Sequence, residues 1–368
     1  MDMLNRLLII IQEQSLSTYI VGGATIIVSY LILVHMLRFR YIHALRRKYP
    51  DPTLPLRDAR VAEEVFDTTF RYDFPSLGRL SLELALFKTY SVPTISKLLV
   101  ATGEFSKNAA KRAEDTGLIL SEMVDPYAHI EIEKRKQSNV DIDKIEAEQR
   151  GRAKTAIERL NEIHGKYDIL NGDYLYTLSL FIRQPIQWIN RYGWRKLDPL
   201  EENAIFRIWY DIGTQMKIKD IPESLDAMNA FHLQYMHENV RYSPSNWKVA
   251  QPTVEHLLSI YPRFLHGLVY KVLPALLDPL DVQGFGLTPA SKSITRMVDN
   301  GLLLQAWIVR HLKLPRFKPT LRTPTKPDKN TNRYKVLFDI YKPVYPDGYC
   351  IHELGPDKFK PAKCPIAH

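Results

Sequence analysis

The chain has 368 residues, of which 45% are hydrophobic and 25% are charged, with a formal net charge of +9. These proportions are ordinary for a folded protein and exclude a disordered or collagen-like chain. Two cysteines, Cys350 and Cys364, exclude a fold built on disulfides, and so low a number is typical of a reducing compartment.

Residues 18–37 form an apolar stretch of 20 residues without Asp, Glu, Lys or Arg. At about 1.5 Å per residue, a helix of this length covers about 30 Å, the thickness of the hydrocarbon layer of a bilayer. A cleaved signal peptide is the alternative, but the apolar core is long for one and no small-residue cleavage site precedes the basic run. The stretch therefore predicts a single membrane-spanning helix.

The positive charge gathers in two clusters. Arg38, Arg40, Arg46, Arg47 and Lys48 follow the predicted span at once, and a second cluster lies at 313–335. The first cluster places the chain after residue 38 in the cytosol and residues 1–17 in the lumen. Beside a membrane, both clusters fit anionic lipid headgroups better than nucleic acid, and we expect no nucleic-acid partner. A solvated tail with no dedicated partner is an equal alternative for the second cluster.

The predicted domain organisation follows from changes of composition along the chain. Residues 38–59 form a basic juxtamembrane linker with three prolines, and residues 60–314 carry mostly helical patterns. Residues 315–368 form a basic, proline-rich arm that we expect to be extended, partly packed back on the domain and mobile at its end. The predicted fold is all-α.

Four helical segments have clear sequence signals. An apolar stripe with a period of 3.6 residues runs from Ala153 to Tyr167 and includes His164. Asp173 is expected to be the N-cap of a helix that follows Asn171-Gly172. Asp198, followed by Pro199 and Glu201, predicts the start of a helix that reaches about residue 216. Thr288-Pro289 is expected to start the last helix, which ends near residue 312.

The chain lacks the motifs of most common membrane enzymes. It has no Gly-rich phosphate loop, no GxSxG, no HExxH and no paired CxxC. The side chains left for cofactor chemistry are histidines, and a lone histidine on an apolar helix face is more often a core residue than a ligand. His164 is the strongest candidate, because a neutral imidazole on a buried helical face suits axial ligation of a haem iron. His232 and His237 are five residues apart, so they diverge around a helix and do not chelate one metal on a straight segment.

The segment from 152 to 227 resembles a known family. It is similar to the core of the latex-clearing-protein (rubber oxygenase) superfamily, and most similar to the fungal MpaB-type branch of endoplasmic-reticulum-bound oxygenases. The residues that carry the resemblance are Arg159-Leu160 with His164, Asn171 with Asp173 to Thr177, Gly193-Trp194-Arg195, Gly213 with Met216, and Ile221-Pro222. The resemblance covers about two thirds of the chain.

The resemblance implies a globin-like helical fold that binds haem b and cleaves a C=C bond of an isoprenoid with O2. In the fungal branch, the implied substrate is the farnesyl side chain of a lipophilic phenolic meroterpenoid in secondary metabolism. The implied location is the membrane of the endoplasmic reticulum, crossed once, with the catalytic domain in the cytosol. Arg159 occupies the position of the family's distal arginine.

The family's proximal histidine has no counterpart, because the corresponding helix reads Tyr174-Leu-Tyr-Thr-Leu-Ser-Leu-Phe. His164 is therefore the candidate axial ligand, with His129 and His237 as fallback candidates, followed by His232, His256 and His266. Arg159 is the candidate catalytic residue, and its structural alternative is an ion pair with Glu162 one turn along the helix.

Two further functions stay open at this stage. The same fold could act as a hydroxylase or peroxygenase on another lipid, or the chain could be a non-catalytic, membrane-tethered lipid-binding protein. A Soret band separates the two enzymes from the binding protein, and product analysis separates the enzymes from each other. The oligomeric state, the electron source and the role of the arm do not follow from the sequence.

Overall fold

The computed structural model of the chain describes residues 16–136, 141–361 and 364. Within these residues the regular structure is helical, and the β pairing there is limited to an isolated bridge between Tyr334 and Tyr349. The all-α prediction is confirmed. The predicted lumenal segment 1–17 lies almost entirely outside the described residues.

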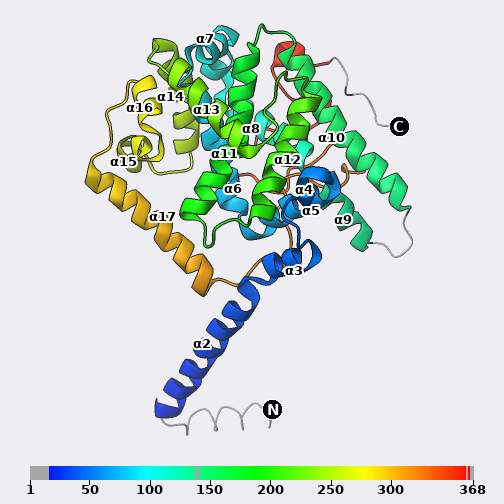
Figure 1. The fold of residues 1–368 in the computed structure, drawn as a ribbon, viewed down its shortest axis with the longest axis vertical. Helices are drawn as coiled ribbons and strands as arrows, with labels where there is room; N and C mark the ends of the chain where they lie inside the picture. Colours follow the sequence, from blue (N-terminus) through cyan, green and yellow to red (C-terminus); the bar gives the residue numbers. More distant parts are fainter. Residues whose placement is uncertain (1–15, 137–140, 362–363, 365–368) are drawn as a thin grey trace.

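The N-terminal helix α2 (Leu16–Arg38) stands out from the rest of the protein (Figure 1). It has 23 residues, and it is long and apolar enough to cross a membrane. Most of its side chains are exposed, whereas Val34 and Arg38, near its end, are buried against the domain. Its bounds enclose the predicted span.

The helices that follow α2 form one layered bundle. Helix α11 lies at its centre and packs against α6, α12 and α13. The helices between α2 and the arm are α3 (Arg40–Lys48), α4 (Leu54–Arg57), α5 (Ala59–Asp67), η1 (Thr68–Asp73), α6 (Pro75–Thr89), α7 (Pro93–Thr102), α8 (Glu104–Val124), α9 (Pro126–Lys136), α10 (Ile142–His164), α11 (Asn171–Tyr192), α12 (Pro199–Gln215), α13 (Leu225–Asn239), α14 (Pro244–Leu258), η2 (Arg263–Leu265), α15 (His266–Val272), η3 (Leu273–Leu276), α16 (Pro279–Gly284) and α17 (Lys292–Leu312).

Two apolar cores hold the bundle together. The larger core lies between α5, α8, α10, α11 and α12, with Phe66, Leu118 and Trp209 almost completely buried in it. A second core joins α6, α14 and α16 around Phe285. Burial of one such large apolar side chain stabilises the fold by about 1.5–3 kcal/mol.

The helix starts show where local signals decide the structure. Helix α12 begins at Pro199 with a capping box between Asp198 and Glu201, as predicted. Asp173 is not the N-cap of α11; it lies inside the first turn, where its carboxylate accepts hydrogen bonds from Thr94 and Tyr235. The last helix begins at Lys292, capped by Ser291, and not at Thr288-Pro289.

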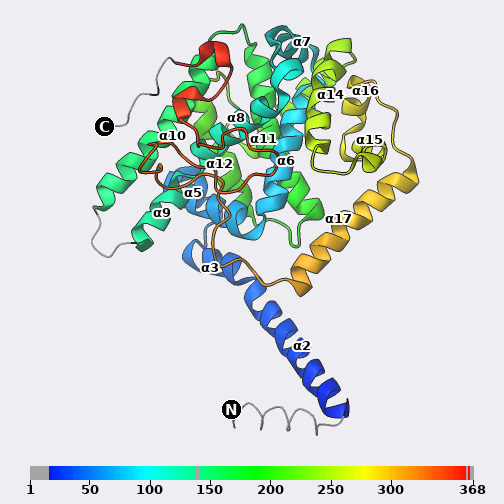
Figure 2. The same ribbon diagram turned by 180° about the vertical axis from the view of Figure 1, so that it is seen from behind.

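The C-terminal arm packs against the domain over most of its length. Figure 2 shows it crossing the face formed by α8, α9 and α10, to which it is hydrogen-bonded. Tyr349, Ile351 and Leu354 of the arm belong to the larger core. The arm also carries a disulfide between Cys350 and Cys364, two cysteines that were not predicted to pair. The arm is therefore part of the folded domain, and more closely packed than expected.

Candidate functional site

Arg159, the predicted catalytic residue, lies where α10 meets the arm. Its Nε donates a hydrogen bond to the carbonyl of Leu354 at 2.9 Å, and Nη2 donates to the carbonyl of Phe359 at 2.9 Å. Its Nη1 pairs with Glu162 at 2.7 Å, which is the ion pair weighed as the structural alternative. The guanidinium is buried, and these contacts hold the arm to α10.

His129 has a similar place on α9. Its Nε2 lies 3.1 Å from the carbonyl oxygen of Thr323 in the arm, so this nitrogen carries the proton and donates it. Burial, followed by the nearby charge of Arg152, lowers the pKa of His129 to about 3. A neutral His129 thus joins α9 to the arm.

His164, the predicted axial ligand, lies at the C-terminal end of α10, half-buried against α11. Its ring centroid is 5.6 Å from that of Tyr174. Burial, followed by the charge of Arg112, lowers the pKa of His164 to about 4. Its Nδ1 is buried and has no hydrogen-bond partner in the described part of the chain. His164 is therefore a neutral imidazole with an unused nitrogen.

His237 is exposed on α13, and His256 and His266 are only partly buried. His256 is half-buried against Tyr341, with ring centroids 4.3 Å apart. His266 lies 3.1 Å from the carbonyl of Tyr261 through Nε2. None of these three is buried as deeply as His129 or His232.

His232 on α13 is almost completely buried, with an exposed fraction of 1%. The Ser179 hydroxyl on α11 lies 2.6 Å from the Tyr176 carbonyl and 2.9 Å from Nδ1 of His232. Because Ser179 gives its one proton to the carbonyl, it accepts a hydrogen bond from Nδ1–H of His232. With the proton on Nδ1, the lone pair of the imidazole lies on Nε2.

The surroundings of His232 keep it neutral and orient its ring. Burial, followed by the charges of Arg183 and Lys88, lowers its pKa to about 3. The ring stacks on Tyr176, with centroids 5.2 Å apart. The Tyr176 hydroxyl is itself buried without a hydrogen-bond partner within the described ranges. The neutral His232 imidazole and this unpaired hydroxyl therefore lie together between α11 and α13.

A buried ion-pair cluster lies beside this pair. Nζ of Lys88 on α6 is 2.5 Å from Asp278, 3.4 Å from Asp281 and 3.2 Å from the Gln184 amide oxygen. Lys88 is 2% exposed, whereas half of the Asp278 side chain is exposed, so the cluster reaches the surface at Asp278. Burial opposes ionisation of Asp278, but Lys88 outweighs it and lowers the pKa of that carboxyl.

We call His232, Ser179, Tyr176, Lys88 and Asp278 the α11–α13 cluster. It brings together residues from α6, α11 and α13 and from the turn before α16. No group of three His, Cys, Asp or Glu side chains able to hold a metal ion occurs among residues 16–136, 141–361 and 364. A haem iron needs only one imidazole from the protein.

Two hollows on the surface lie outside this cluster. One, of about 450 Å³, is lined mainly by apolar and aromatic side chains of α14 and the turn after α16, including Trp247 and Phe285. The other, of about 170 Å³, lies between α5, α9 and the arm and contains Asp67. Burial raises the pKa of Asp67 to about 7, although Arg71 opposes the rise.

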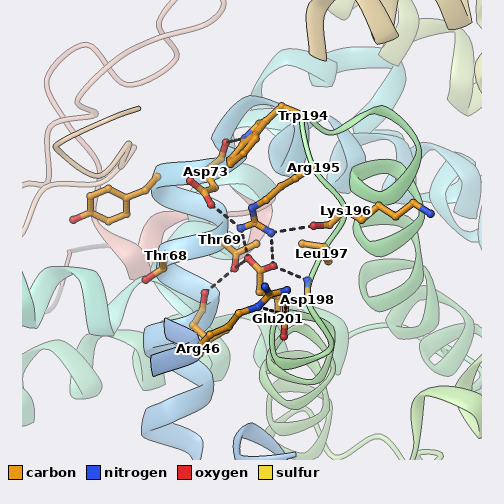
Figure 3. A network of polar contacts seen from close by, with 12 residues as sticks. Arg46, Thr68, Thr69, Asp73, Trp194, Arg195, Lys196, Leu197, Asp198 and Glu201 are labelled. Carbon is orange, nitrogen blue, oxygen red and sulfur yellow. Dashed lines mark hydrogen bonds and ion pairs between the residues drawn. The ribbon is translucent and has the colours of Figure 1, made fainter. Parts of the chain in front are cut away.

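The Gly193-Trp194-Arg195 element takes part in a clamp of ion pairs and hydrogen bonds before α12, and Figure 3 shows Trp194 and Arg195 in it. The Arg195 guanidinium donates to Asp73 at 2.6 Å and to both oxygens of Glu201, at 2.6 and 2.7 Å. Glu201 also accepts a hydrogen bond from Thr69 at 2.7 Å. The clamp joins η1, which is a π-helix, to the start of α12. It fixes η1 against the start of α12 and shares no residue with the α11–α13 cluster.

The fold and the cluster define a class: an all-α protein with one apolar N-terminal helix and a buried, neutral imidazole between its central helices. No protein-family model matches the chain. Three curated proteins do. It is 32% identical to the ER-bound oxygenase mpaB of Penicillium roqueforti (strain FM164), over 69% of this chain and 85% of that protein.

Two proteins of Penicillium brevicompactum also match. The ER-bound oxygenase mpaB' is 25% identical over 91% of this chain and 87% of its own length. The ER-bound oxygenase mpaB is 29% identical over 63% of this chain and 60% of its own length. The chain therefore belongs to the MpaB family of ER-bound oxygenases, as the resemblance in its central segment indicated.

In the sequence, His232 ranks behind His164, His129 and His237 as a candidate ligand. The hydrogen bond that distinguishes it comes from Ser179, which lies 53 residues earlier in the chain. Ser179 lies in the helix expected after Asn171-Gly172, but no local pattern relates it to His232. Only the packing of α13 on α11 turns that serine into a partner for a histidine.

Proposed function

We propose that this protein is an oxygenase anchored in the membrane of the endoplasmic reticulum, with its catalytic domain in the cytosol. Membership of a family of ER-bound oxygenases is the observation that carries this proposal. The apolar helix α2, with basic residues from Arg38 to Lys48 after it, supports the anchor and the orientation. Protease treatment of intact microsomes tests the orientation, because a cytosolic domain is cut and a lumenal one is protected.

The reaction we propose is cleavage of a C=C bond in the prenyl side chain of a lipophilic phenolic meroterpenoid. The double bond breaks, and each of its two carbons takes one oxygen atom of O2, which gives two carbonyl fragments. This balance needs no external electron donor. A membrane anchor suits such a substrate, because a farnesyl chain partitions into the bilayer.

We further propose haem b as the cofactor and His232 as the residue that holds it. The fit rests on chemistry: His232 is buried and neutral, and its Nδ1 is fixed by Ser179, so that Nε2 offers a lone pair. Metal-binding histidines commonly have their second nitrogen fixed by such a hydrogen bond. A bound haem would supply the iron that binds and activates O2.

His164 is the second candidate, because its buried Nδ1 has no partner in the part of the chain that the structure describes. The two histidines contact Tyr174 and Tyr176, which are two residues apart on α11 and therefore face opposite sides of that helix. They define two alternative sites for one cofactor. We favour His232, because it is more completely buried and its tautomer is fixed.

The other residues of the α11–α13 cluster would help His232 to hold the haem, through their charge and by keeping water away from the imidazole. After burial, the positive charges of Arg183 and Lys88 are the largest causes that lower the pKa of His232. Haem carries two propionate carboxylates, and buried carboxylates need such partners. Tyr176 covers one face of the imidazole. These residues would keep the His232 imidazole neutral and in one orientation.

Product analysis tests the proposed reaction. Microsomes that contain the full-length protein are incubated with a farnesylated phenol and isotopically labelled O2. We expect a phenol with a shortened side chain and label in both fragments. A substrate of full length that carries one new oxygen would indicate a hydroxylase instead. Unchanged substrate, with no Soret band in the purified protein, would favour a lipid-binding protein.

A further inference from the structure

Helix α17 differs from the other long helices of the domain in how little of it is covered. It runs along the side of the protein and ends beside the top of α2 in both views (Figures 1 and 2). None of its 21 residues is buried. A helix of this length with no buried residue leaves one complete face without a partner inside the described chain.

The uncovered face carries large apolar side chains. Met297, Leu304 and Trp307 are spaced seven and three residues apart, so they lie on one side of the helix. Their exposed fractions are 51%, 57% and 52%. Leu303 flanks them and is 48% exposed. Soluble surfaces seldom show such a row, because apolar side chains are stabilised by removal from water.

The C-terminal end of α17 is attached to the end of the proposed membrane helix. The Tyr30 hydroxyl of α2 donates to the carbonyl of Leu312 at 2.9 Å. Arg38 donates to the carbonyl of Lys313, and Arg310 lies over the ring of Phe39 at 5.6 Å. These contacts place the last turn of α17 at the level where α2 leaves the apolar layer.

The segment after α17 continues this attachment. Arg40 and Tyr41 of α3 both donate to the carbonyl of Arg316, each at 2.7 Å. The guanidinium of Arg40 also lies 4.0 Å from the ring centroid of Phe317, a residue that is 58% exposed. The exposed apolar surface of α17 is thus continuous with the juxtamembrane region of α2 and α3.

We propose that α17 is an interfacial helix that lies in the cytosolic leaflet, with its apolar face in the bilayer. The partner is a lipid surface with anionic headgroups. Helices of this kind bury their apolar face about 5–10 Å into the boundary between headgroups and acyl chains. Exposed basic residues on and after α17 suit such a surface: Lys292, Arg296, Arg310, Lys313 and Arg316.

The neighbouring elements extend the contact. Helix α15 packs against α17. Phe264 and Leu268, in η2 and α15, are 82% and 48% exposed. With this face on the membrane, the domain would be held against the leaflet in one orientation. A prenylated substrate dissolved in that leaflet would then meet the protein without first entering water.

Trp307 provides a direct test, because Trp188, Trp194 and Trp209 are buried and Trp247 is half-buried. Full-length protein is reconstituted in vesicles of phosphatidylcholine and phosphatidylserine that contain lipids spin-labelled near the headgroup or near the end of the chain. We expect the headgroup-proximal label to quench the fluorescence more than the deep label. The quenched component should be absent from Trp307→Phe.

Leu304→Glu and Gln305→Glu form a matched pair, since each adds one negative charge to adjacent exposed positions. At 3.6 residues per turn, position 305 is rotated by about 100° away from the apolar row. We expect the quenching of Trp307 to fall in Leu304→Glu and to stay at the wild-type level in Gln305→Glu. Equal quenching in wild type and Trp307→Phe would overturn it, as would equal loss in the two charged variants.

This placement of α17 rests on the proposed anchoring by α2. Alkaline carbonate extraction distinguishes a failure of the anchor from a failure of the interfacial helix. Protein that stays in the vesicles without quenching of Trp307 contradicts the interfacial helix alone. Protein that is released contradicts the anchor, and the placement of α17 with it. Protection of Trp307 from both lipid and aqueous quenchers would mean that a second protein copy covers the face, which also overturns the proposal.

Discussion

The hydroxyl of Ser179 lies 2.9 Å from Nδ1 of His232, and this contact decides which nitrogen of the imidazole carries the proton. The serine proton is directed to the carbonyl of Tyr176 at 2.6 Å, so the hydroxyl accepts from the ring. The free lone pair on Nε2 follows from this one serine. A serine on α11 thus orients a histidine on the neighbouring helix α13.

Ser179→Ala should weaken haem binding without unfolding the protein. Loss of a hydrogen bond that orients a metal-binding histidine typically costs 10–100-fold in metal affinity, and we expect a loss of about that size here. Titration of the apoprotein with haem measures it. Ser81→Ala is the matched control, because Ser81 is also a buried helical serine that bonds the carbonyl three residues earlier. Equal affinities in the two variants would exclude a role for Ser179 in orienting the ligand.

Arg159→Lys should loosen the arm more than it slows the reaction. Lysine cannot reproduce the fork that joins Leu354, Phe359 and Glu162, so limited proteolysis within residues 354–361 should accelerate. If these contacts are its whole role, the rate stays within about threefold of wild type, a small change in activation free energy. A loss of about a hundredfold with bound haem and an intact arm would instead support the distal role that the family resemblance implies.

Arg195→Met should destabilise the domain strongly. Its removal leaves Asp73 and Glu201 buried without their cation, which typically costs about 3–5 kcal/mol. Chemical denaturation measures the loss. Arg46→Met is the control, because its ion pair with Asp198 is exposed on the arginine side and is worth about 0–1 kcal/mol. Similar free energies of unfolding for the two variants would show that the clamp contributes no more to stability than the exposed ion pair of Arg46.

Asp67→Asn should stabilise the protein at pH 8 and leave it nearly unchanged at pH 4. The folded carboxyl has a pKa of about 7, raised by burial, against 3.8 as its ordinary value. Between these values the folded state holds a proton that the unfolded state lacks, so stability falls as the pH rises. Because the side chain is partly exposed and screened by water, we expect a gain of about 1–2 kcal/mol. Thermal unfolding at both pH values measures it, and a gain at pH 4 as large as at pH 8 would contradict the raised pKa.

The sequence predicted those parts of the fold whose signals are local. The capping box at Asp198 and Glu201 is complete within four residues, and α12 begins where it indicates. Asp173 failed as a predicted N-cap because Thr94 and Tyr235 compete for its carboxylate through tertiary contacts. The last helix starts after Thr288-Pro289 because Ser291 provides the cap.

The candidate site was harder to predict, since its chemistry depends on contacts between distant segments. Arg159 and His129 look like functional groups in the sequence, and the structure places both against the arm. No local pattern reveals that the arm returns to α9 and α10. His232 acquires its character from Ser179, Tyr176 and Lys88, which lie on other helices.

The absorption spectrum of the purified full-length protein tests the central claim most directly. We predict a Soret band near 400 nm, of the kind given by a histidine-bound haem, in the wild type and in His164→Ala. We predict its loss in His232→Ala, with helix content unchanged by circular dichroism. A band that survives in His232→Ala and is lost in His164→Ala would move the site to the other side of α11. A wild type that takes up no haem would contradict the account of the cofactor.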